Sequence, residues 1–153
     1  MSGQPPLRLA VQQASLRPVP KRAQVRRWVA ATLEAARAKR AAEIVVRFCD
    51  GAEARRLNRQ FRARDYATNV LTFSEDYPDR IVADIVLCVP VLEKEARAQE
   101  KPVKNHTAHL VVHGVLHALG HDHASAREAR RMEALETRIL ARFSVPDPYQ
   151  APA

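Results

Sequence analysis

Residues 81–88 read Ile-Val-Ala-Asp-Ile-Val-Leu-Cys, a nearly continuous apolar run that only Asp84 interrupts. A run of this length and composition is typical of a central strand that is buried on both faces of a sheet. A carboxylate in such a run is costly unless it is paired or hydrogen-bonded. We therefore expect Asp84 either to cap a neighbouring backbone group or to point into an active cleft, and the sequence favours neither role.

Three further segments have the composition of strands. Residues 7–14 alternate apolar and polar side chains, residues 44–49 are rich in β-branched side chains, and residues 69–73 read Asn-Val-Leu-Thr-Phe. Between the last of these and the central run, the turn-forming residues 76–79 (Asp-Tyr-Pro-Asp) predict a bulging loop.

Helical patterns alternate with these strands. Apolar side chains recur at helical spacing over residues 21–40 and about 105–119, and Pro90 suits the first turn of a helix that runs to about residue 99. Residues 50–53 and 125–128 resemble capping boxes that open two more helices. The chain shows no repeats and no long linker.

The segment at 113–123 reads His-Gly-Val-Leu-His-Ala-Leu-Gly-His-Asp-His. Positions four apart lie on one face of a helix, so His113 and His117 present their imidazoles side by side. Gly120 can end the helix in a left-handed turn, which lets the chain bring His123 back toward the pair. Three protein nitrogens leave one tetrahedral position free, which predicts a catalytic metal site with a bound, activated water.

The other polar residues of this region have less specific roles. All six histidines fall between positions 106 and 123, which favours a metal site over unrelated core histidines. Zinc is the usual occupant of such a hydrolytic site, although imidazole also suits copper, iron and nickel. His109 could line the cleft or contact substrate, and Asp122 could orient a ligand histidine. His121 could add a fourth imidazole and close the site.

The same histidine spacing occurs in the metzincin peptidases, whose motif is His-Glu-x-x-His-x-x-Gly-x-x-His. In those enzymes the glutamate after the first histidine is the general base toward the zinc-bound water. This chain has Gly114 in that place, and a glycine cannot accept a proton. Gly114 therefore argues against peptide hydrolysis.

The composition favours a nucleic-acid partner. A length of 153 residues suits one domain with its own core, with residues 1–6 and 147–153 as flexible ends. The formal net charge of +8 and the pI near 10.2 attract polyanions such as phosphate backbones. Aromatic residues make up only 5% of the chain, so we expect contacts to the nucleic-acid backbone to dominate over base stacking.

Two features bear on the compartment. Cys49 and Cys88 each end an apolar run and are far from any second cysteine at zinc spacing, so we expect buried free thiols. The first residues lack a secretion signal, and no stretch approaches the length needed to span a bilayer. We expect a cytoplasmic protein without a membrane partner, and the sequence does not predict its oligomeric state.

Taken together, these motifs resemble the YbeY endoribonuclease family of bacteria, whose members are also called rRNA maturation factors. The resemblance covers most of the chain, and its core is the histidine motif with glycine where peptidases have glutamate. Further similar stretches are residues 57–65, 69–73, 83–87, 132–136 and 146–149. The chain departs from the family pattern at Ala67, Ala83 and His121, where proline, glycine and tyrosine are usual.

The resemblance implies a zinc-dependent endoribonuclease that cuts single-stranded RNA. It further implies a role in maturing rRNA precursors near the end of the small-subunit RNA and in quality control of ribosomal subunits. Arg62 matches the family's essential arginine, which would stabilise charge on the phosphate. The implied fold is α+β: a small mixed sheet of about four strands packed with helices, with the metal site on a helix and the following loop. The order of the strands is not implied.

A different class of function stays open. The chain could be a non-catalytic ribosome-assembly or RNA-binding factor in which the three ligands and His121 lock a loop around a structural zinc ion. The open fourth position and Arg62 favour catalysis over this alternative.

Overall fold

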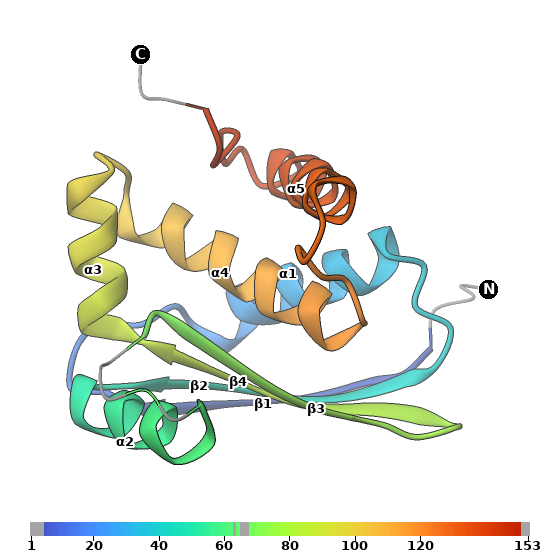
Figure 1. Cartoon of the computed structure of the whole chain (residues 1–153), viewed down its shortest axis with the longest axis horizontal. Helices are drawn as coiled ribbons and strands as arrows, with labels where there is room; N and C mark the ends of the chain where they lie inside the picture. The colour runs from blue at the N-terminus through green and yellow to red at the C-terminus, as the bar shows by residue number, and fades with distance from the viewer. Residues whose placement is uncertain (1–4, 63, 65–67, 151–153) are drawn as a thin grey trace.

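The apolar run forms β4 (Arg80–Cys88), which lies between two other strands of a mixed sheet. In the part of the chain that the structure describes, the sheet has four strands in the order β1-β2-β4-β3, with β1 at Leu7–Ala14, β2 at Ala41–Cys49 and β3 at Val70–Asp76. Strands β1, β2 and β4 are parallel, and β3 pairs with β4 antiparallel. This computed structural model confirms the predicted α+β fold (Figure 1).

The structure describes residues 5–62, 64 and 68–150. Residues 65–67, which include Ala67 and part of one family-like stretch, lie outside these ranges. The same holds for residues 1–4 and 151–153 of the ends that were expected to be flexible. Within the described ranges, no helix combines the length and the apolar character that crossing a membrane requires.

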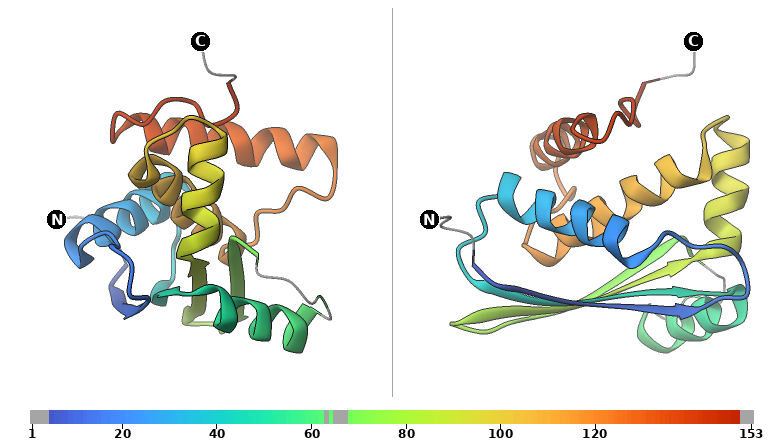
Figure 2. Two further views of the ribbon diagram at one scale, coloured as in Figure 1. Left: turned by 90° about the vertical axis from the view of Figure 1, so that its left-hand side faces the viewer. Right: turned by 180° about the vertical axis from the view of Figure 1, so that it is seen from behind.

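The helices lie on both faces of the sheet, as Figures 1 and 2 show. One face carries α1 (Arg22–Ala35), α3 (Val89–Ala98) and α4 (Val103–Ala118), and α5 (Ala126–Ala141) packs on the outer side of α4. The short α2 (Gly51–Arg62) covers one end of the opposite face. Helix α4 is therefore enclosed between the sheet and α5.

This central position explains the composition of α4. Val112, Val115 and Leu116 are fully buried, as the sequence predicts, but Ala108 and Val111 are fully buried as well. A helix that is apolar nearly all round belongs in a core rather than on a surface. Helix α4 is thus the helix against which α1, α3 and α5 pack.

The central strand β4 is buried on both faces only in its second half, where Val86 and Cys88 are buried on the face that α2 covers. Its side chains Ala83, Ile85 and Leu87 are buried under the helices, whereas Asp84 points to the other face and is exposed. Because α2 covers only one end of that face, the carboxylate stays hydrated and needs no buried partner. Asp84 therefore does not point toward the histidine-bearing helix.

Several local predictions can be compared with the structure. Helix α1 ends at Ala35 rather than near residue 40, because Arg37 adopts a left-handed conformation with φ of 55°. The expected bulging loop at 76–79 is instead a tight turn, in which the Tyr77 amide donates to the Arg80 carbonyl at 2.9 Å. The capping interaction of Ser125 with the Glu128 amide is present at 3.1 Å.

Both carboxylates of the capping box predicted at residues 50–53 have tertiary partners. Asp50 accepts a hydrogen bond from the Ser15 hydroxyl, and Glu53 pairs with the Arg47 guanidinium at 2.6 Å. These contacts to Ser15 and Arg47 join the start of α2 to other parts of the fold.

Candidate metal centre

Three imidazoles meet at the C-terminal end of α4. One ring nitrogen from each of His113, His117 and His123 lies within 4.8 Å of the other two. His113 and His117 are one helical turn apart, with ring centroids 5.4 Å from each other. The ring of His123 lies 5.9 Å from His113 and 5.4 Å from His117, measured between centroids. The structure thus brings together the three side chains that the sequence predicts to be ligands.

Backbone geometry explains how the third histidine returns to the helix. Gly120 has φ of +97°, a left-handed conformation that costs glycine little. The Gly120 amide donates to the His117 carbonyl at 3.0 Å, and the His121 amide donates to the Leu116 carbonyl at 3.0 Å. These two bonds define a Schellman motif, which ends α4 and turns the chain back.

The loop residues beside the ligands have different roles. Asp122 accepts a hydrogen bond from the His123 amide at 2.7 Å, which holds the loop, but its carboxylate lies 3.9 Å from Nδ1 of His123. That separation is too long for a direct hydrogen bond to the ring. Among the described residues, His121 is not a member of the group of converging nitrogens.

The electrostatics of the triad suit a neutral imidazole. Burial lowers the pKa of His117, and the nearby His113 and His123 lower it further. A neutral ring has a lone pair that a metal can accept, whereas a protonated ring has none. His117 is therefore ready to act as a ligand at neutral pH.

A functional residue that the sequence analysis missed lies behind His113. Glu136 on α5 has no solvent exposure, and its Oε2 atom is 2.7 Å from Nδ1 of His113. Its other oxygen accepts a hydrogen bond from the Tyr149 hydroxyl. Burial alone would raise the pKa of Glu136, but the nearby His109 and the hydrogen bonds with His113 and Tyr149 outweigh it and lower the pKa to about 2.

A signal for Glu136 exists in the sequence. Glu136 lies four residues after Met132 and three before Ile139, among the buried residues of α5. A carboxylate in the middle of a core-facing stripe requires a buried partner, and one was available on the histidine-bearing helix.

His109 lies on the side of α4 that faces Glu136 rather than the cleft. Its Nε2 atom is 3.2 Å from the Tyr149 hydroxyl and 3.6 Å from Oε2 of Glu136. His109, His113 and Glu136 form a second group of metal-ligating atoms within 4.8 Å of one another. Tyr149 falls in the stretch expected to be flexible, yet it is anchored in this group.

The three histidines line one wall of a hollow of about 470 Å³. The same hollow is lined by Arg62 at the end of α2, whose Nη2 atom donates to the Thr72 carbonyl at 3.1 Å. The guanidinium carbon of Arg62 lies 5.9 Å from the centre of the Phe73 ring. Arg64 and polar groups of Asn58, Thr68, Asn69, Thr72 and Ser74 complete the lining. We call this hollow the histidine cleft; it combines metal-ligating nitrogens with a cation, and Asp84 is not among its lining residues.

Packing explains why glycine follows the first ligand. A Cβ atom at Gly114 would lie 2.8 Å from Cγ2 of Ile85 and 3.3 Å from Oγ1 of Thr72. A glutamate of the peptidase kind cannot be accommodated here unless the helix and the sheet separate.

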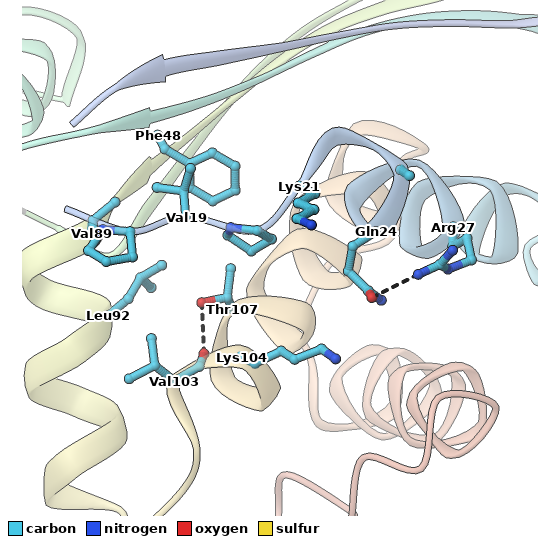
Figure 3. Close-up of a pocket in the computed structure, with 13 residues that line it drawn as sticks. Val19, Lys21, Gln24, Arg27, Phe48, Val89, Leu92, Val103, Lys104 and Thr107 are labelled. Carbon is cyan, nitrogen blue, oxygen red and sulfur yellow. Dashed lines mark hydrogen bonds between the residues drawn. The ribbon is translucent and has the colours of Figure 1, made fainter. Parts of the chain in front are cut away.

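A second hollow, of about 440 Å³, lies near the N-terminal end of α4 (Figure 3). Its floor is apolar and includes Val19, Phe48 and Leu92, and Lys21 and Lys104 stand at its rim. No histidine or carboxylate occurs among its described lining residues. Within the part of the chain that the structure describes, this hollow therefore offers no imidazole or carboxylate ligand for a metal.

Comparison with known proteins agrees with this geometry. Residues 10–144 match the sequence model of a family described as Endoribonuclease YbeY. A Bordetella avium protein named endoribonuclease YbeY is 54% identical, with 97% of this chain and 96% of the relative covered. A protein of the same name from Thiobacillus denitrificans is 53% identical, with 96% and 99% covered. The solution structure of a Thermotoga maritima protein shares the fold, with a TM-score of 0.58 at 22% identity over 96% of this chain and 98% of that one.

Proposed function

The chain belongs to the YbeY endoribonuclease family, and we propose that it is a zinc-dependent endoribonuclease that cuts single-stranded RNA. The observation that carries the proposal is the histidine cleft itself, in which three converging imidazoles line the same hollow as Arg62. The names of the relatives support an RNA substrate. The net charge of +8 supports binding to a phosphate backbone.

The donor set fits zinc. Three imidazole nitrogens from a helix and its following loop match the ligands of catalytic zinc sites, which keep a fourth position for water or substrate. When bound, zinc supplies Lewis-acid chemistry, polarising a phosphoryl oxygen and making water a stronger nucleophile at neutral pH. Because Nδ1 of His113 is engaged by Glu136, its Nε2 atom is the nitrogen that would hold the ion.

Arg62 would bind and stabilise the phosphate. One of its N–H groups is used by the Thr72 carbonyl, and the remaining donors can contact phosphate oxygens. The Phe73 ring beside the guanidinium limits its freedom, so the cation is held in the cleft before substrate arrives. Stabilising charge on the phosphate as it develops in the transition state is the role we assign to Arg62.

We further propose that the substrates are rRNA precursors. Their cleavage would contribute to small-subunit rRNA maturation and to ribosome quality control, both in the cytoplasm. A single domain would carry the whole activity. These finer assignments rest on the family resemblance. Ribosomal subunits are the partners that follow from them.

The proposal is tested with paired variants. His117→Ala should lose both metal and cleavage, whereas Arg62→Glu should keep its metal and lose cleavage by about a hundredfold or more, as expected for loss of a transition-state donor. Arg59→Glu is the matched control, because Arg59 is an exposed arginine on the same helix and does not line the histidine cleft. The measurements are metal content and cleavage of a labelled single-stranded RNA.

Each failure has a distinct meaning. Undiminished cleavage by both variants would indicate a contaminating nuclease. A native protein that holds zinc and binds RNA without cutting it would support the alternative of an assembly factor with a structural metal.

A further inference from the structure

We propose that the buried Glu136 and the partly exposed Tyr149 form a hydrogen-bond relay that positions His113 as a metal ligand, which makes the segment after α5 a working part of the metal centre. The inference rests on the proposed function only in requiring that the three histidines bind a metal. It assigns a positioning role to two residues that do not themselves touch the ion.

The first step is the location of Glu136. The side chain has no solvent exposure and lies on the same helix face as the core residues Met132 and Ile139. An ionised carboxylate in such a place is costly unless each oxygen is hydrogen-bonded. Both oxygens are: Oε2 lies 2.7 Å from Nδ1 of His113, and Oε1 accepts from the Tyr149 hydroxyl.

The second step concerns the tautomer of His113. An ionised carboxylate has no proton to donate, so in the hydrogen bond to Glu136 the donor is the Nδ1–H group of His113. The proton on Nδ1 leaves the lone pair on Nε2. A carboxylate that fixes the tautomer and the ring orientation in this way also strengthens a histidine as a metal ligand.

The third step is the anchoring of Tyr149. Its amide donates to Oδ1 of Asp147 at 2.9 Å, and its ring packs edge-on against His109 with centroids 5.4 Å apart. The Pro148 carbonyl accepts from Nζ of Lys101 at 2.9 Å. Because the segment is tied at several points, the Tyr149 hydroxyl is held against Oε1 of Glu136, while His113 contacts Oε2.

Helix α4 carries a second histidine–carboxylate pair that serves as a natural control. Nε2 of His106 lies 2.9 Å from Oε1 of Glu95, so the chemistry of the pair is similar. His106 belongs to neither group of converging ligand atoms among the described residues. Loss of the Glu95 carboxylate should therefore perturb α4 without affecting metal binding.

The experiment measures the zinc dissociation constant by competition with a chelator. We expect Glu136→Gln to weaken zinc binding by about ten- to a hundredfold, the range typical of lost ligand-orienting partners, and Tyr149→Phe to weaken it by a smaller factor. Glu95→Gln and Tyr77→Phe should leave the constant unchanged. Tyr77 is a suitable match for Tyr149, since its hydroxyl also donates to a carboxylate, that of Glu75, far from the metal centre.

A readout without metal separates positioning from general destabilisation. In the metal-free native protein, ¹⁵N spectra should show His113 as the Nδ1–H tautomer, and Glu136→Gln should mix the two tautomers. Thermal unfolding of the same samples shows whether each variant is folded. If Glu136→Gln does not fold, the zinc dissociation constant of Tyr149→Phe tests the relay.

Native zinc affinity in both Glu136→Gln and Tyr149→Phe would overturn the inference. An equal loss of zinc affinity in the controls Glu95→Gln and Tyr77→Phe would overturn it as well. These outcomes differ from failure of the proposed function. A protein that binds zinc through its histidines but cuts no RNA would contradict the nuclease proposal and leave the relay intact.

Discussion

Gly114 on α4 packs directly against Ile85 on β4, so closely that a Cβ atom at position 114 would lie 2.8 Å from Cγ2 of Ile85. This contact sets the distance between the histidine-bearing helix and the sheet. Since β3, with the cleft residue Thr72, is paired with β4, this contact also sets the width of the histidine cleft. The absence of a side chain after the first ligand is thus a packing requirement as well as the loss of a peptidase base.

Gly114→Ala should destabilise the protein. Overpacking typically costs about 1–3 kcal/mol, and the better helix propensity of alanine returns about 1 kcal/mol, so we expect a net loss of up to about 2 kcal/mol in the free energy of unfolding. Gly51→Ala is the control, because nothing lies within 4 Å of an added Cβ there. Urea unfolding of both variants measures the difference. Equal stability of Gly114→Ala and the native protein would show that α4 can move away from the sheet at no cost.

Gly120→Ala should affect both stability and metal binding. A non-glycine residue in a left-handed conformation costs about 1–2 kcal/mol, and the φ of +97° at this position requires such a conformation. Relief of the strain would displace the loop that holds His123, so zinc affinity should fall together with the free energy of unfolding. A variant that is destabilised but binds zinc with native affinity would indicate that the third ligand does not depend on the turn.

The two thiols should be unreactive in the folded protein. Cys49 and Cys88 are free thiols that lie opposite each other at the ends of the neighbouring parallel strands β2 and β4. Both are buried. Burial raises the pKa of Cys49 to about 12 and raises that of Cys88 as well. Because the thiolate is the reacting species, a thiol-specific dye at pH 8 should label neither cysteine until denaturant is added, when both react. Rapid labelling under native conditions would contradict this burial.

Acid should weaken the ion pair between Arg47 and Glu53. The hydrogen bond from Arg47 lowers the pKa of Glu53 below its usual 4.5 despite partial burial, so the pair stabilises the fold above that pH and is lost as the pH falls below it. The pair is partly exposed, so we expect Glu53→Gln to cost at most about 1 kcal/mol at pH 7 and nothing near pH 2. Glu43→Gln is the control, as its carboxylate lies 3.7 Å from Arg80 in an exposed pair. A cost that is the same at both pH values would exclude this linkage.

The features that the sequence predicts correctly depend on short-range geometry. The histidine spacing, the left-handed Gly120 and the Ser125 cap each involve residues within a turn or two of one another, so local rules are sufficient. The resemblance to a family was confirmed by the match over residues 10–144 and supplied Arg62, which local rules alone could not distinguish from its arginine neighbours.

The features that the sequence does not predict depend on which elements lie against each other. The exposure of Asp84 follows from the short span of α2, which leaves that face of β4 open. The pairing of Glu136 with His113 follows from the packing of α5 on α4. Neither arrangement can be read from periodicity, which gives the face of an element but not its partner.

The link between the three histidines and RNA cleavage is tested most directly by a zinc titration of metal-free protein, with cleavage of a labelled single-stranded RNA as the readout. The rate should rise in proportion to added zinc, level off at one ion per chain, and stay at background for His117→Ala. Full cleavage by native protein whose metal has been removed, as verified by elemental analysis, would contradict a metal-dependent nuclease.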